Sequence, residues 1–276
     1  MNKKSKRKVV KTQKATKVIP EEKDQESQDE EEILDPREKY MTIGDHLEEL
    51  RKRIFAIIGV WLAASIFVGI FSPYIHSILV QPYREYSNEP LILGTVYGPL
   101  EIYFKLSLIL GFIIALPISL AIMWGFITPA VSQRAATIGY TVVISSAFLF
   151  WLGVWFAWKY LFPLSLRMMF QLFLPAETVP QTSIEKYYSF LFFLLIGTGA
   201  TFQLPLVVIL LGFLEILTLE WHKKAWKFIV VSIFFFSAFI TPPDPFSMFV
   251  MAFPLLLLYG VSVGIVWLFE LRRKRY

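Results

Sequence analysis

Six apolar blocks, almost free of charged residues, limit what this chain can fold into more than any other feature. A helix that crosses a bilayer needs about 20 mainly apolar residues, because backbone groups in hydrocarbon find hydrogen-bond partners only within the helix. All the blocks except the fifth reach that length. We therefore predict an all-α membrane protein, with six transmembrane helices in a curved bundle and short fifth and sixth spans. The predicted spans are residues 54–72, 106–131, 135–158, 187–214, 225–241 and 246–269.

The distribution of positive charge predicts the orientation of these spans. If all six cross and the N-terminus is cytoplasmic, the basic residues at 51–53, 134, 223–227 and 271–276 all lie inside. The three outer loops carry a mixture of charges. If the fifth block did not span, the basic C-terminal cluster would face outward, so we expect six spans with both termini cytoplasmic.

Composition also excludes several classes of function. The chain is 55% hydrophobic, and its net charge of +5 lies mostly at the ends and in short loops, so the charge indicates orientation rather than nucleic-acid binding. It has no cysteine, which excludes disulfides and thiolate metal sites. Nucleotide-binding and hydrolase motifs are missing, and its three histidines lie outside the predicted spans. We expect a protein that is not an enzyme and needs no cofactor or metal.

The two ends differ from the predicted six-span region at 41–270. Residues 1–40 are rich in lysine and then in acidic residues, with too little apolar surface to offset the entropy of ordering. We expect a disordered, charged cytoplasmic tail there, without a cleavable signal peptide. It is either a solvated extension or a segment whose lysines are attracted to anionic lipid. Residues 271–276 form a basic cytoplasmic tail.

Within the spans, proline and one amide are the notable residues. Pro117, Pro205 and Pro254 each remove a backbone hydrogen bond and predict kinks. Gln203 is the most polar side chain at depth, and it is either a hydrogen-bonding link between helices or a functional contact.

The stretch "DHLEELRKRI" combines acidic and basic residues just before the first span. A capping pattern predicts a helix that begins near residue 43. Glu48 lies four residues before Lys52 and Glu49 four before Arg53, so intrahelical ion pairs can form. Such pairs contribute only about 0.3–0.5 kcal/mol, so a carboxylate at this membrane face could instead bind a cationic peptide.

This stretch resembles the N-terminal signature of the TatC family, the polytopic subunit of the twin-arginine (Sec-independent) protein translocase. The resemblance covers about residues 41–270 and includes six spans in the same order. It also rests on five further segments, "GPLEIYFKLSLILG" (98–111), "MWGFITPA" (123–130), "FP" (162–163), "GATFQLPLV" (199–207) and "FITPPDPFSM" (239–248).

The resemblance implies a receptor for twin-arginine signal peptides and a scaffold that exports folded proteins, driven by the proton motive force. It implies a bacterial-type inner (cytoplasmic) membrane as location. The implied partners are single-span TatA-type and TatB-type subunits and the signal peptides of folded cargo, with the chain a homo-oligomer within a larger complex. No nucleic acid is implied.

The resemblance also places the signal-peptide site. Glu49 matches the carboxylate that recognises the paired arginines, with Arg51 beside it, and Phe126 matches an aromatic residue near the same site. A second family carboxylate, in the first cytoplasmic loop, falls on Ala135. Glu48 is therefore a candidate substitute, as is Glu220.

Further positions carry over from the family. Gln203 stands where many relatives have a glutamate, which excludes a mechanism that titrates this side chain, and Thr241 matches a docking position for single-span partners. On the outer side, we expect structural or functional roles for Glu101, Lys105, Asp244 and Pro82. Lys105 could simply snorkel, and Asp244 could simply form a turn.

Two other functions compete with this interpretation. The proline-broken spans are compatible with a secondary transporter for a small solute, but the span centres lack titratable residues. A structural assembly factor without peptide specificity is the second alternative, and it predicts that charge changes at Glu49 alter only stability.

Overall fold

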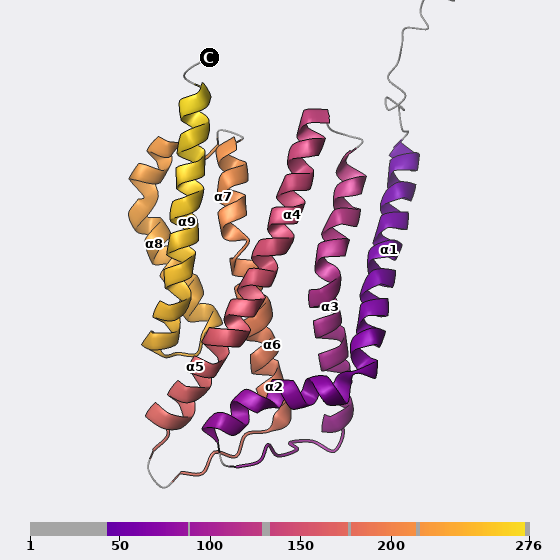
Figure 1. Cartoon of the computed structure of the whole chain (residues 1–276), viewed down its shortest axis with the longest axis vertical. Coiled ribbons are helices and arrows are strands. Elements are labelled where there is room, and N and C mark those ends of the chain that lie inside the picture. Colours follow the sequence, from indigo (N-terminus) through magenta and orange to yellow (C-terminus); the bar gives the residue numbers. More distant parts are fainter. Residues whose placement is uncertain (1–42, 88, 129–132, 176–177, 214–215, 274–276) are drawn as a thin grey trace, which may run out of the picture. The chain divides into compact units, whose positions relative to one another are not determined.

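The computed structural model describes residues 43–87, 89–128, 133–175, 178–213 and 216–273, and every regular element in these ranges is a helix (Figure 1). The chain divides into two compact units, residues 1–42 and 43–276, and all the described helices belong to the second. The predicted tail at 1–40 lies outside the described residues, as does the last part of the tail at 271–276.

The long helices run alternately between two ends of the bundle (Figure 1). We call the end where α1 begins and α9 ends the upper end, and the opposite end, where α2 (Ser72–Tyr86) lies crosswise, the lower end. The fourth crossing is made by two helices in succession, α6 and α7. The bounds are Ile43–Ile70 for α1, Gly98–Ile127 for α3, Gln133–Phe156 for α4, Ile184–Thr201 for α6, Leu204–Phe213 for α7, Leu219–Ile240 for α8 and Pro245–Arg273 for α9.

Five helical segments among the described residues are long and apolar enough to cross a membrane, which makes this a multi-pass membrane protein. Helix α8, which covers most of the predicted fifth span, is not one of these five segments, because its first turns carry several charged residues. The prediction of a short sixth span is wrong, since α9 has 29 residues. Helix α8 has 22 residues and begins before the predicted fifth span, just after Thr218, which caps it by accepting a hydrogen bond from Trp221 N.

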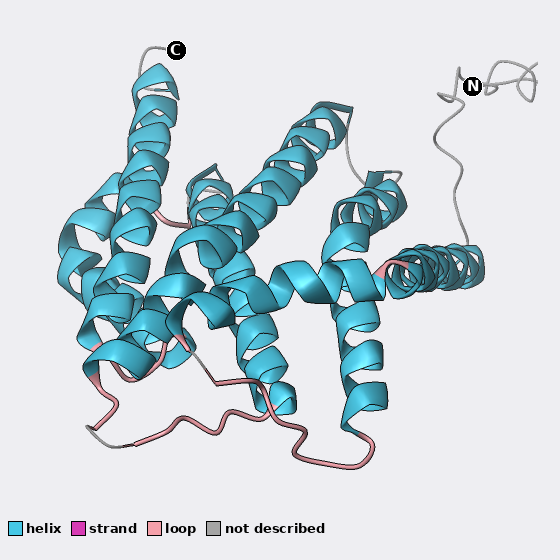
Figure 2. Cartoon of the chain, turned by 60° about the horizontal axis from the view of Figure 1, so that its bottom comes forward, coloured by secondary structure: helices cyan, strands magenta, loops and turns pink. Residues whose placement is uncertain are grey.

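The predicted outer loops are more helical than expected. The first contains α2, and the helix that begins as α4 continues through a π-helical turn, α5 (Phe162–Arg167) and a second π-helical turn to Leu172. What remains of the two loops meets at the lower end (Figure 2), where Ile184 N donates to Ile92 O at 2.9 Å and Ile92 N donates to Thr182 O at 3.1 Å. These bonds fasten the start of α6 to the segment before α3.

The three predicted proline positions differ in the structure. Helix α6 ends at a turn through Phe202 and Gln203, just before Pro205, and α7 starts there. Pro117 and Pro254 remain inside the continuous helices α3 and α9. Of these three prolines, Pro205 is thus the one beside which the structure separates two helices, next to Gln203.

The core surrounds α6, where Tyr188, Leu191 and Leu194 are fully buried against neighbouring helices. At one side of the bundle α1 packs mainly on α3, and at the other α7 and α8 pack on α9. The α1–α3 contact is close because Gly111 has no side chain. A Cβ atom at Gly111 would lie 2.3 Å from Ser65 Oγ and 2.6 Å from Ser65 Cα.

Candidate functional site

The two predicted ion pairs at the start of α1 are confirmed, but they differ in burial. Lys52 Nζ lies 2.9 Å from Glu48 Oε1, and these side chains are 73% and 62% exposed. Arg53 Nη2 lies 2.9 Å from Glu49 Oε1, and these are only 34% and 20% exposed. The first pair therefore faces outward from the chain, and the second lies against α3.

Arg53 joins α1 to the upper end of α3. Its Nη1 approaches Ile122 O at 3.5 Å and its Nη2 approaches Gly125 O at 3.4 Å. Carbonyls near a helix C-terminus carry partial negative charge, which favours a cation beside them. Gly125 leaves room for this contact, because a Cβ there would lie 2.6 Å from Arg53 Nη1. The sequence predicted only the ion pair of Arg53 with Glu49, because a contact between two helices leaves no pattern within one of them.

One of the two carboxylate oxygens of Glu49 lacks a hydrogen-bond partner among the described residues. Arg53 Nη2 donates to its Oε1 at 2.9 Å, while Oε2 is buried and has no hydrogen-bond partner among the described residues. A buried acceptor without a partner is costly, because it has lost the water that would otherwise bond to it. The site therefore holds an acceptor that still lacks a donor, and another molecule can supply one only if the groups that cover Oε2 move aside.

An aromatic pair lies at the same end. Phe126 of α3 and His46 of α1 stack with ring centroids 4.3 Å apart and an interplanar angle of 19°. The structure thus brings Phe126 to the helix that carries Glu49. His46 was not singled out from the sequence, because a lone histidine before a span carries no pattern of its own.

The remaining residues expected at this site lie elsewhere. Arg51, expected beside Glu49, has its guanidinium carbon 5.6 Å from the centre of the Phe55 ring. Glu220 lies in the first turn of α8, on the opposite side of the bundle from α1 in Figure 1, so it is badly placed to replace the missing loop carboxylate. The side chain of Ala135 lies outside the described ones.

Gln203 is bonded inside the chain. Ser146 Oγ donates to its Oε1 at 2.8 Å, and its Nε2 donates to Ser146 O at 2.9 Å. Ser146 belongs to α4, so the amide links α4 to the turn between α6 and α7. This is the hydrogen-bonding link that the sequence left as one of two alternatives.

Thr241 and Asp244 shape the turn between α8 and α9. Thr241 Oγ1 donates to Ser237 O at 2.9 Å. Asp244 Oδ1 accepts from Ser247 N at 2.7 Å in the manner of a helix cap, while its buried Oδ2 has no partner among the described residues. Both side chains are buried.

The outer-side residues of the prediction lie at the lower end. Lys105 Nζ is 2.5 Å from Glu101 Oε1 and 3.1 Å from Ser189 Oγ of α6, so Lys105 is bonded rather than simply snorkelling. Pro82 is buried within α2. Glu185 of α6 accepts from Gly94 N at 3.1 Å and from Thr95 N at 3.3 Å, which adds to the bonds between the two loops.

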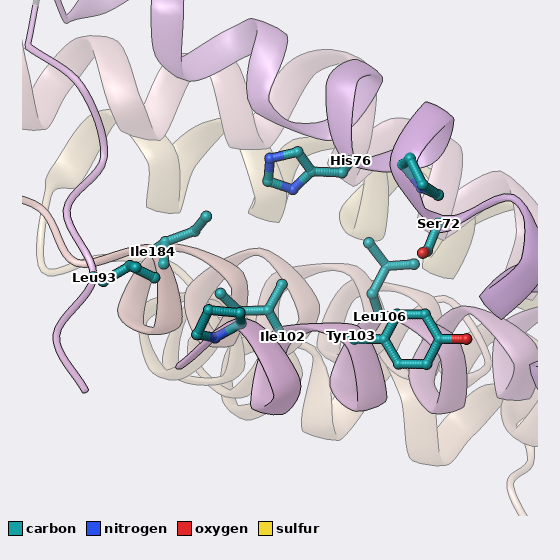
Figure 3. A pocket seen from close by; sticks show the side chains of 9 residues that line it. Ser72, His76, Leu93, Ile102, Tyr103, Leu106 and Ile184 are labelled. Carbon is teal, nitrogen blue, oxygen red and sulfur yellow. The ribbon is translucent and has the colours of Figure 1, made fainter. Parts of the chain in front are cut away.

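A pocket of about 260 Å³ also lies at the lower end, between α2 and α3 (Figure 3). His76 lines it and is 2.7 Å from the Tyr188 hydroxyl through its Nδ1. Burial lowers the pKa of His76 below its ordinary value, and the nearby Arg84 lowers it further. Ile102, Tyr103 and Leu106 make most of the wall apolar. Within the described part of the chain, no group of acidic and histidine residues could hold a metal ion.

A model of the family described as Sec-independent protein translocase protein (TatC) matches residues 45–254 of this chain. The chain belongs to the TatC family. The relative from Aquifex aeolicus (strain VF5) is 34% identical over 225 residues, which are 81% of this chain and 93% of that protein. The relative from Escherichia coli (strain K12) is 29% identical and covers 79% of this chain and 85% of that protein.

The TatC family is also the one that the fold resembles. The crystal structure of a twin-arginine translocase receptor, TatC, in the detergent DDM matches with a TM-score of 0.67 and 35% identity. The match covers 80% of this chain and 98% of that one. The chain is therefore a component of a Sec-independent protein translocase, and the TatC family is not a family of enzymes.

Proposed function

We propose that the chain is the signal-peptide receptor of its translocase and binds twin-arginine peptides at the upper end of α1 and α3. The observation that carries the proposal is the buried, unpartnered Oε2 of Glu49. In the proposed complex, a guanidinium group of the peptide donates to this oxygen.

The surroundings of Glu49 favour arginine over lysine. Guanidinium is planar and presents several donors in a fixed geometry, whereas an ammonium group is a strongly hydrated point charge. Arg53 already holds Oε1 and fixes the carboxylate against α3, so the carboxylate needs little ordering when the peptide arrives. The stacked rings of His46 and Phe126 supply an apolar surface for the rest of the peptide.

In this proposal all six predicted spans cross the bacterial inner membrane, with α8 as the fifth and both termini in the cytoplasm. The alternating direction of the helices and the lysines at the upper end of α8 support this arrangement. Export is driven by the proton motive force, in keeping with a sequence that has no nucleotide-binding motif.

We further propose single-span TatA-type and TatB-type subunits as partners, in a complex that holds several copies of this chain. Thr241 and Gln203 remain the candidate partner contacts, although a partner would have to displace Ser146 from the Gln203 amide. Glu101, Lys105, Asp244 and Pro82 then act mainly by holding the lower end in shape.

Binding of a labelled twin-arginine signal peptide to the detergent-solubilised full chain tests the proposal, with a twin-lysine peptide beside it. Glu49→Gln should weaken arginine-peptide binding about 10- to 100-fold, the effect of losing a charge-assisted hydrogen bond. Glu48→Gln is the matched control. Because its carboxylate is exposed and pairs only with Lys52, binding should change by no more than about twofold.

Two results would contradict the receptor. Equal binding of both peptides to the unmutated chain would show that it has no specificity for arginine. That result would favour an assembly factor or a transporter. Equal losses in the two variants would mean that Glu49 has no special place and that the general acidity of the helix start attracts the peptide.

A further inference from the structure

We propose that the cavity between α7, α8 and α9 binds an acyl chain of an anionic phospholipid, whose headgroup rests on the lysines at the start of α8. This site is separate from Glu49 and goes beyond signal-peptide binding. The cavity has a volume of about 490 Å³, within the range of about 300–1,000 Å³ typical of ligand sites.

The shape of the cavity suits a hydrocarbon chain. It follows one face of α8 from Trp221 to Phe236, roughly 22 Å at the helical rise of 1.5 Å per residue. That exceeds the depth of one leaflet, about half of a hydrocarbon core of about 30 Å. Val207 of α7 and Leu255 of α9 are typical of its apolar walls. A partner helix, about 10 Å across with its side chains, would not fit in this volume.

One end of the cavity is polar. His222 lines it there, is only 4% exposed, and lies 2.9 Å from the Tyr259 hydroxyl through its Nδ1. Its Nε2 is buried and has no hydrogen-bond partner in the described part of the chain. When Tyr259 donates to Nδ1, Nε2 carries the proton, and it can donate to an ester carbonyl of the kind that joins every acyl chain to its glycerol.

Positive charge adjoins the same end. Lys224 follows Trp221 by three residues and precedes Phe228 by four, so it shares a helix face with two residues that line the cavity. Lys223 lines a neighbouring cavity of about 380 Å³ that also includes His222 and Tyr259. Basic pockets between transmembrane helices bind anionic headgroups, so this end selects an anionic over a zwitterionic lipid.

The preference for an anionic headgroup is tested by titrating the delipidated full chain in detergent. The titrants are phosphatidylglycerol and phosphatidylcholine with identical acyl chains, and native mass spectrometry counts the bound lipids. Phosphatidylglycerol should bind more tightly. Lys224→Gln should weaken phosphatidylglycerol about fivefold, the effect of one lysine near a headgroup, and should leave phosphatidylcholine unchanged. Equal affinity for the two lipids in the unmutated chain would overturn the proposal.

The cavity is tested by filling it. Ser232 lines the cavity and is exposed, so Ser232→Trp should occupy the space of several methylene groups and weaken phosphatidylglycerol about tenfold. Val231→Trp is the matched control, since Val231 is the preceding residue, is 68% exposed and does not line the cavity. Equal lipid binding by the two variants would exclude this site. Normal lipid binding together with loss of a co-purified single-span subunit would assign the cavity to that partner instead.

Discussion

Replacing Gln203 by methionine isolates a polar link between α4 and the turn that joins α6 to α7. Methionine has nearly the same length and volume as glutamine, so the packing between α4 and the α6–α7 turn is largely preserved. Both hydrogen bonds to Ser146, at 2.8 and 2.9 Å, are lost. The substitution therefore measures what these two bonds contribute.

The expected size follows from the number of bonds. Interhelical hydrogen bonds inside membrane proteins contribute about 0.6 kcal/mol on average and up to about 1.7 kcal/mol. Two of them predict a loss of about 1–3 kcal/mol in Gln203→Met, which lowers Tm by about 3–10 °C for a chain of this size.

Thermal unfolding in detergent, followed by circular dichroism, measures this loss. Ser146→Ala should cost about half as much, because the Ser146 carbonyl remains and still accepts from Gln203 Nε2. In the Gln203→Met background, Ser146→Ala should cost almost nothing, since both changes break the same contact. Fully additive losses, or an unchanged Tm in Gln203→Met, would refute the assignment of this amide as a structural link.

Three further predictions concern the lower end. Asp244→Ala should lower the free energy of unfolding by about 0.5–2 kcal/mol through loss of the α9 cap, and Asp244→Asn, which keeps the acceptor, should lower it less; chemical unfolding in detergent compares them. Because the pKa of His76 is lowered in the folded chain, the unfolded chain binds a proton at His76 more tightly. The stability that neutral His76 contributes is therefore complete above the unfolded pKa of about 6.5 and is lost as the pH falls below it. Tm should drop between pH 8 and pH 5, and it should drop less in His76→Gln. Glu185→Ala should speed hydrogen exchange at the amide of Gly94, while the amide of Val68 in α1 should still exchange slowly. Unchanged exchange at Gly94 would contradict the hydrogen bond between Gly94 N and Glu185.

The local features of this chain could be predicted because they depend on spacing within one helix. The Glu48–Lys52 and Glu49–Arg53 pairs follow from residues four apart. A disturbance at Pro205 was also predicted, as a kink, whereas the structure separates α6 from α7 there. The apolar blocks predicted helices for the same reason, since a membrane leaves the backbone no other partner.

The contacts between helices could not be predicted, because they depend on how two helices are rotated and shifted against each other. Arg53 bonds to carbonyls 69 and 72 residues away, and His46 of α1 likewise stacks on Phe126 of α3. Helix α2 was mistaken for a loop because it is amphipathic, with Arg84 at its end, and a search for long uncharged blocks overlooks such helices.

Gly111 lies where α1 and α3 approach each other closely. Its contact with Ser65 sets the distance between α1 and α3 in the middle of the two helices. Phe126 lies fifteen residues further along α3, roughly 22 Å at the helical rise, so a change in the distance between α1 and α3 at Gly111 also shifts the helix ends at Phe126. A single methyl group at Gly111 would push α1 and α3 apart, and Arg53 would lose its hydrogen bonds to the carbonyls of α3. If the proposed receptor function holds, signal-peptide binding at this end would then change through Gly111, a residue far from the peptide.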